Sequence, residues 1–388
     1  MRKGTVALLP AMLIVSTSCS EDSRSLPAVE APNRVAVPTV VAGAVDGPGA
    51  LGRVAHVEMG RSGEILVADG QAQAILVFDQ EGEYSRTIGR AGSGPGEFTQ
   101  VTRIGWTQDT LWTSDPFASR IHLWDADLRF VRTITTMMPA PPPGALGVFT
   151  GAWMAESWVL GVPAAMGPHP GIPLLLVSED GSEIRELPPI STEGQMVPME
   201  FSSGPFDVSN PWSDAPLWLN AADGESIVIV GRRVAEEPDR AEFMVTRIGV
   251  NGDTLLHRGV EYAPEAMDPD HANDRLGELA EQVARARSIP VPEALRVISA
   301  NLTPPAFFPP VSELVPGRDG TIWLRREMHR ADSVDWHVFT ADAEPLSRVR
   351  LPVGFDVQGA ELDRVWGVVR DSLEIPFVQI YDIHSPSN

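Results

Sequence analysis

Cysteine is nearly absent from this chain of 388 residues, which has a single one, Cys19. A lone thiol cannot form a disulfide within the chain, so strand pairing and packing must hold the fold together. Local catalytic motifs are missing too: there is no Gly-x-Ser-x-Gly segment, and no His-x-x-x-His pair among the eight histidines. The glycine-rich residues 89–98 have no Walker lysine. We interpret that loop as a turn device rather than a phosphate cradle.

Positive charge is also scarce. The chain has 30 lysines and arginines against 52 acidic residues, which gives a formal net charge of −22. The phosphate backbone of a nucleic acid would be repelled, and no basic stripe is present to bind it. The same charge gives the chain no attraction to anionic lipid. We interpret the acidity as a source of solubility, with an acidic binding role as the alternative.

No apolar run is long enough to span a bilayer as a helix. The longest candidate, residues 5–15, follows Arg2 and Lys3 and precedes small residues and Cys19. This arrangement resembles a bacterial lipoprotein signal, which implies that residues 1–18 are cleaved and that Cys19 is lipidated. An ordinary secretory signal is the alternative, because Ser16 stands where the lipoprotein pattern has an aliphatic residue.

Both signal types predict an exported protein of the cell envelope. The lipoprotein resemblance favours the outer membrane, since Ser20 rather than Asp follows the cysteine. Residues 19–34 are polar and interrupted by proline, which predicts a flexible tether. We expect contact with the membrane through the lipid anchor only.

Glycine and proline are abundant, with 34 and 35 residues, and favour many turns and short strands. Residues 64–98 are partly repeated in residues 110–134, with a period of 115 − 69 = 46 residues. Asp69 and Asp115 are each followed at offsets of 6, 9 and 10 by an isoleucine, an aromatic residue and an aspartate. A repeat of this length without a long helix is typical of propeller blades.

The strand pattern predicts an all-β fold, a six-bladed β-propeller over residues 35–384, with seven blades as the alternative count. The last unit has only three strands, and residues 35–45 form a strand without a hairpin partner. We therefore predict that this N-terminal strand completes blade six and closes the ring. Closure leaves no edge to pair, so we expect a monomer.

One segment departs from the strand pattern and predicts a helical insertion, residues 264–310, between blades four and five. Residues 270–287 place Leu276, Leu279 and Val283 on one helical face, and Pro292 suits the first turn of a second helix.

The pattern in residues 64–98 resembles an NHL-type repeat, and the whole chain resembles uncharacterised bacterial six-bladed β-propeller lipoproteins. The resemblance implies a fold. It does not choose an activity, because related six-bladed propellers include scaffolds, ligand binders, lactonases and lyases.

Connectivity predicts which face is functional. In a four-stranded blade, the connections between blades and the loops between strands two and three lie on one face. The long segments 191–214 and 264–310 both connect blades, so we predict that this face is functional and that the helical segment partly covers the channel mouth.

Two sets of candidate ligand-binding residues are expected on that face. Asp69 and Asp115 occupy equivalent loop starts, where they would approach a ligand or cation, or cap backbone amides. Arg325, Arg326 and His329 could hold a carboxylate or phosphate, or be solvated charges.

A third set is expected in the channel. His56, Arg103 and Glu313 fall on innermost strands, where they would bind a ligand or form an ordinary polar lining with water. Of the ten tryptophans, we assign Trp112, Trp124, Trp323 and Trp366 to packing, whereas a carbohydrate platform would use Trp153, Trp158, Trp212 and Trp218.

The leading hypothesis is a ligand-binding or protein-interaction module of the cell envelope, more a binding protein than an enzyme, with an envelope protein, a peptide or a glycan as partner and no cofactor. The alternative is a metal-dependent hydrolase or lyase, lactonase-like or amidating-lyase-like, with calcium or zinc in the channel. That alternative needs at least three ligating side chains from different blades to meet at one point. The sequence names no catalytic residue and no metal ligand, and a purely structural role is a third possibility.

Overall fold

The computed structural model describes residues 33–135, 145–165, 171, 173–237, 241–326 and 332–385. Cys19, the predicted signal and nearly all of the predicted tether lie outside these residues. The described part confirms a six-bladed β-propeller.

Blades one to five are four-stranded antiparallel meanders whose strands pair in sequence order. Blade one contains β2 (Val54–Met59), β3 (Ile65–Asp69), β4 (Ala74–Phe78) and β5 (Tyr84–Ile88); blade two contains β6 (Arg103–Thr107), β7 (Thr110–Asp115), β8 (Arg120–Trp124) and β9 (Phe130–Thr135). Blade three contains β10 (Ala145–Met154), β11 (Trp158–Ala165), β12 (Leu175–Ser178) and β13 (Ile184–Glu186). Blade four contains β16 (Leu217–Asn220), β17 (Ser226–Gly231), β18 (Ala241–Gly249) and β19 (Thr254–Tyr262), and blade five contains β20 (Glu313–Pro316), β21 (Ile322–Arg326), β22 (Ser333–Phe339) and β23 (Pro345–Pro352).

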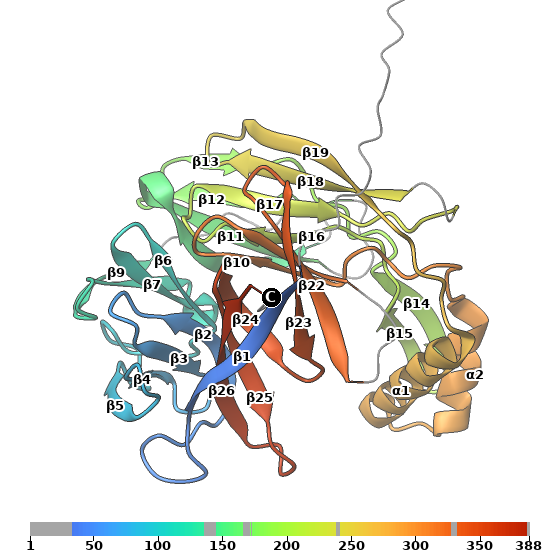
Figure 1. Cartoon of the computed structure of the whole chain (residues 1–388), viewed down its shortest axis with the longest axis horizontal. Coiled ribbons are helices and arrows are strands. Elements are labelled where there is room, and N and C mark those ends of the chain that lie inside the picture. Colours follow the sequence, from blue (N-terminus) through green and yellow to red (C-terminus); the bar gives the residue numbers. More distant parts are fainter. Residues whose placement is uncertain are drawn as a thin grey trace, which may run out of the picture. The chain divides into compact units, whose positions relative to one another are not determined.

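Blade six is built from both ends of the chain. It contains β24 (Asp356–Glu361), β25 (Arg364–Arg370), β26 (Pro376–His384) and β1 (Asn33–Ala42). β1 pairs antiparallel with β26 from Val35 opposite His384 to Ala42 opposite Val378, and its first three residues also pair with β23. Figure 1 shows β1 in blue among the red strands of the C-terminal end. The predicted closure by the N-terminal strand is confirmed.

Apolar side chains fill the spaces between neighbouring blades. The strands β3 and β4 are buried along their whole length, whereas β5 is mostly exposed, because neighbouring blades cover both faces of the middle strands. One apolar cluster joins Val57 of blade one to Trp366 and Val378 of blade six, and further clusters join the other neighbours. Packing therefore runs around the whole ring.

The helical insertion is confirmed as α1 (Pro269–Arg287) and α2 (Val291–Asn301) between β19 and β20. The side chain of Asp268 accepts a hydrogen bond from the Asp270 amide and caps α1. Within the described residues, neither helix has the length and apolar character needed to cross a bilayer.

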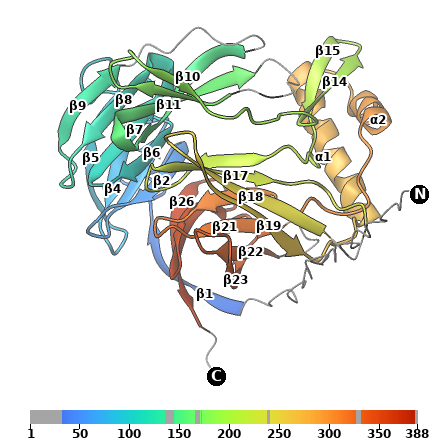
Figure 2. The same cartoon turned by 90° about the horizontal axis from the view of Figure 1, so that it is seen from above.

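The segment 191–214, predicted as a polar connection, instead contains a hairpin, β14 (Met196–Phe201) and β15 (Gly204–Ser209). Met199, Phe201 and Val208 pack against α1 and α2 in a separate apolar core. Figure 2 shows the hairpin and both helices grouped beside the blades. The helices thus cover the hairpin. The expectation that they form a lid over the channel mouth was wrong, because no residue of α1 or α2 lines the cavity on the propeller axis.

Candidate functional site

The antiparallel meanders place the insertions on one face of the ring. Each chain segment that enters a blade does so at the end where the loop between its second and third strands lies. The β14–β15 hairpin and the α1–α2 pair both connect blades, so they share this end with the β17–β18 loop. We call it the insertion-bearing face.

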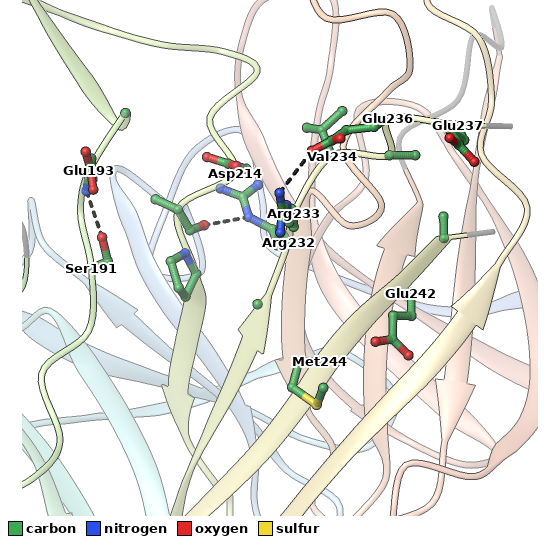
Figure 3. A pocket seen from close by; sticks show the side chains of 16 residues that line it. Ser191, Glu193, Asp214, Arg232, Arg233, Val234, Glu236, Glu237, Glu242 and Met244 are labelled. Atoms are coloured by element: carbon green, nitrogen blue, oxygen red, sulfur yellow. Dashed lines mark hydrogen bonds and ion pairs between the residues drawn. The ribbon is translucent and has the colours of Figure 1, made fainter. Parts of the chain in front are cut away.

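An open cavity of about 970 Å³ lies on the insertion-bearing face, and we call it the blade-four cavity. Its walls come from the two ends of the hairpin insertion, near Glu193 and Asp214, and from the β17–β18 loop and the start of β18. Figure 3 shows Arg232 and Arg233 between acidic side chains on both sides. Glu193, Asp214, Glu236, Glu237 and Glu242 give five carboxylates against two guanidinium groups.

The two arginines of the blade-four cavity already have partners. Arg232 donates from Nε to the Ala215 carbonyl at 2.8 Å and from Nη1 to the Val311 carbonyl at 3.1 Å, so it ties blade four to the chain that enters blade five. Arg233 forms an exposed ion pair with Glu236 at 2.9 Å. Among the described residues, no basic side chain pairs with the other four carboxylates, which leaves the rim acidic.

A second cavity, of about 590 Å³, lies on the axis between the inner strands β2, β6, β16, β20 and β24. We call it the channel cavity. It extends to the loops between the first and second strands, which include Arg61, Gln108, Asp223 and Arg318. These loops lie opposite the insertion-bearing face, so the two cavities open at different ends.

A buried carboxylate, Glu58, lies in the wall of the channel cavity. Its Oε1 accepts a hydrogen bond from the Met59 amide at 2.8 Å, and Arg318 Nε is 3.8 Å away. Arg318 Nε is also 3.7 Å from Glu361, so one guanidinium serves two carboxylates. Burial raises the pKa of Glu58 to about 7, although Arg318 opposes the shift.

His56 and Arg103, both predicted channel residues, line the channel cavity on the neighbouring strands β2 and β6. Burial lowers the pKa of His56 to about 3, and the positive charge of Arg103 adds to this effect, so His56 is neutral. Burial also lowers the pKa of Arg103, but a guanidinium remains charged. Among the described residues, neither side chain has a hydrogen-bond or ion-pair partner.

Asp69 and Asp115 are both almost completely inaccessible to solvent, at 1% and 0% exposed. Asp69 accepts hydrogen bonds from the amides of Gly52, Gln71 and Ala72 at 2.6 to 2.9 Å. Asp115 accepts one from the Thr99 amide and pairs with Arg120, both at 2.7 Å. These contacts account for the repeated aspartate as a backbone cap, and we leave both residues out of the proposed site.

The remaining candidates join strands and blades. Glu313 and Arg325 form an ion pair across β20 and β21. Arg326 is buried, with its guanidinium 4.6 Å from the centre of the Tyr262 ring and a hydrogen bond of 3.1 Å to the Ala263 carbonyl. None of these three lines either cavity. His329 lies outside the described residues.

The tryptophans pack and do not form a carbohydrate platform. Trp112, Trp124, Trp323 and Trp366 are buried, as predicted. Trp153, Trp158 and Trp212 are buried in apolar clusters as well, and Trp218 is partly buried against one of them. These four tryptophans therefore do not form an exposed aromatic platform.

The described residues contain no group of three or more histidine, cysteine, aspartate or glutamate side chains that could hold a metal ion. The convergence of ligands that would favour the calcium or zinc enzyme is therefore not found in this part of the chain.

Sequence reasoning missed Glu58, Arg318, Trp112 and Asn220 as lining residues of the channel cavity. A signal existed for Glu58, which is two residues after His56 on the same strand and therefore shares its side. Arg318 lies in the turn between β20 and β21, and nothing local in the sequence indicates that its side chain reaches the Met59 carbonyl of blade one.

Solved propeller structures from several bacteria are similar in architecture at low identity. A Bacteroides fragilis protein described as exported is 9% identical, with a TM-score of 0.43, over 91% of this chain and 96% of its own. Virginiamycin B lyase from Staphylococcus aureus is 12% identical, with a TM-score of 0.38, over 84% and 93%. The calcium-binding protein regucalcin from Agrobacterium tumefaciens is 12% identical, with a TM-score of 0.41, over 91% and 97%.

No curated protein matches the chain by sequence. A family model described as a 6-bladed beta-propeller matches residues 50–137, which span blades one and two, the part of the chain where the repeat is clearest.

Proposed function

We propose that this protein is an exported, lipid-anchored propeller of the cell envelope that binds a basic peptide segment of another envelope protein in the blade-four cavity. The observation that carries the proposal is a set of four carboxylates around an open cavity on the insertion-bearing face that have no basic partner among the described residues.

The size and the charge of the cavity both support a peptide. The cavity is open to solvent, and a volume of about 970 Å³ accommodates several side chains of a peptide. Carboxylates at a rim steer an oppositely charged partner and set its register. Because Arg232 and Arg233 already have partners, the excess negative charge is available to lysine or arginine side chains of a ligand.

A charge-reversal variant tests this function. The full chain, purified in detergent, is titrated into a fluorescein-labelled peptide of alternating arginine and glycine, and binding is followed by anisotropy. The double variant Glu237→Lys with Glu242→Lys should weaken binding roughly tenfold, because two rim charges of up to about 1 kcal/mol each are reversed. Binding should also weaken as salt is raised.

The matched control carries the same change in net charge on the other face. Glu81 and Glu83 are exposed in the turn between β4 and β5, and Glu81→Lys with Glu83→Lys should change affinity by about twofold or less. Equal losses in the two double variants would mean that the peptide responds only to the overall charge, and the blade-four cavity would not be the binding site.

The anchor is tested separately. Cys19→Ser should abolish incorporation of radiolabelled palmitate and move the protein from the detergent phase to the aqueous phase in a phase-partition assay, because acyl chains provide the membrane affinity. A wild-type chain that is exported but found in the aqueous phase would support the ordinary secretory signal instead.

A further inference from the structure

Three buried polar atoms that have no hydrogen-bond partner within the described part of the chain line the channel cavity. They are Nδ1 of His56, Nε1 of Trp112 and Oδ1 of Asn220. Trp112 and Asn220 are 2% and 7% exposed, and Asn220 already uses its Nδ2 to donate to the Ala221 carbonyl at 3.3 Å. A buried polar group without a partner is unfavourable, so these atoms call for bound water or a ligand inside the channel.

A positive charge, that of Arg103, also lies in the wall of this cavity. Arg103 is only partly exposed and has no hydrogen-bond or ion-pair partner among the described residues. The carboxylate that acts on it, Glu58, accepts from the Met59 amide and faces Arg318. Because the pKa of Glu58 is raised to about 7, this residue carries only part of its negative charge at neutral pH. A guanidinium that faces a cavity without a paired carboxylate can take one from a ligand, which makes an anionic ligand its natural complement.

We propose that the channel cavity binds a small organic acid that carries, besides its carboxylate, a hydroxyl or ammonium donor. Each polar group of this ligand would pair with one polar side chain of the cavity. The Arg103 guanidinium can hold a carboxylate through two parallel hydrogen bonds, and Trp112 Nε1 can only donate, which suits another oxygen of the ligand. Asn220 Oδ1 can only accept, so the ligand must also bring a donor.

This site is independent of the proposed function, because the channel cavity and the blade-four cavity open at opposite ends and share no lining residue. The variant Glu237→Lys with Glu242→Lys should therefore bind the organic acid normally.

Three acids of nearly equal size test the proposal: propionate, lactate and alanine. The full chain is titrated with each sodium salt or zwitterion by calorimetry and thermal denaturation, with sodium sulfate and sodium chloride at matched ionic strength as controls. Lactate or alanine should bind at least tenfold more tightly than propionate, and should raise the melting temperature by about 4 °C at a hundredfold excess over its dissociation constant. Which of the two binds better identifies the donor as hydroxyl or ammonium.

The variant Arg103→Met distinguishes a ligand-binding role of Arg103 from a purely structural one. It should abolish acid binding and yet leave the ligand-free melting temperature unchanged or higher, because the partly exposed guanidinium forms no hydrogen bond or ion pair among the described residues that the change would break. Arg61→Gln is the matched control: it lines the same cavity, but its guanidinium is paired with Asp109 at 3.0 Å, and its loss should change affinity by about twofold or less. The proposal is overturned if none of the three acids exceeds the sulfate and chloride controls, or if Arg103→Met destabilises the free protein and leaves acid binding intact.

Discussion

A chain that begins at Val45, and so lacks β1, is expected to lose cooperative folding, whereas a chain that begins at Asn33 should melt at the temperature of the full chain. β1 fills the edge of β26 over seven residue pairs, and its loss would expose a strand edge and open the ring between blades six and one. We expect a loss of roughly 5 kcal/mol or more, comparable to the whole stability of a typical domain. Circular dichroism melts and size-exclusion chromatography measure it.

A pair of point variants separates the contribution of β1 from the length of the chain. Ala42 is completely buried at the contact between blades six and one, whereas its neighbour Val41 is 54% exposed. Ala42→Asp should destabilise the protein by roughly 3 kcal/mol or more, because it buries a charge without a partner, and Val41→Asp should change stability by about 0.5 kcal/mol or less. Equal effects, or a Val45 chain that melts normally, would show that β1 does not close the ring.

Closure also matters for the channel. The lining of the channel cavity comes from the inner strands of five blades, β2, β6, β16, β20 and β24, and Arg318 of blade five reaches the Met59 carbonyl of blade one at 3.0 Å. These contacts bring together residues about 260 positions apart in the sequence. A ring opened at blade six would therefore lose the geometry of Glu58 and Arg318 before it lost any single blade.

The parts of the fold that repeat were predictable from the sequence. Asp69 and Asp115 recur at a fixed period because each caps the amides at the same place in its own blade, and this local task leaves a local pattern. The closing strand was predictable for a related reason. One end of the chain has a strand without a partner and the other end has a blade of three strands, so pairing the two completes the blade.

The parts that depend on distant partners were not predictable. Met199 and Phe201 belong to a hairpin whose buried side is covered by α1 and α2, about seventy residues further along, so the segment alone gave too little apolar signal for a strand pair. The candidate sites could not be predicted in full for the same reason, since they too depend on residues far apart in the sequence. His56 and Arg103 could be placed on inner strands, but whether another side chain would neutralise Arg103 depends on which residues all the other blades bring to the axis.

Gly359→Ala is expected to destabilise the protein by about 3 kcal/mol, because no space exists for a side chain there. A Cβ atom at Gly359 of β24 would lie 2.4 Å from the Trp366 ring, which is completely buried and donates Nε1 to the Val57 carbonyl of blade one at 3.1 Å. The ring would have to move, which adds overpacking to the loss of a hydrogen bond between blades. The free energy of unfolding in urea measures the effect.

Gly277→Ala is the matched control for Gly359→Ala. Gly277 lies within α1, where an added Cβ would meet no atom within 4 Å, so the alanine should stabilise the protein by about 0.5 to 1 kcal/mol through helix propensity. The double variant Gly359→Ala with Trp366→Leu should be less than additive, since the smaller side chain vacates the space that the new methyl group needs. Full additivity, or a Gly359→Ala chain as stable as the wild type, would show that Trp366 is not held against β24, and the contact between blades six and one would need another explanation.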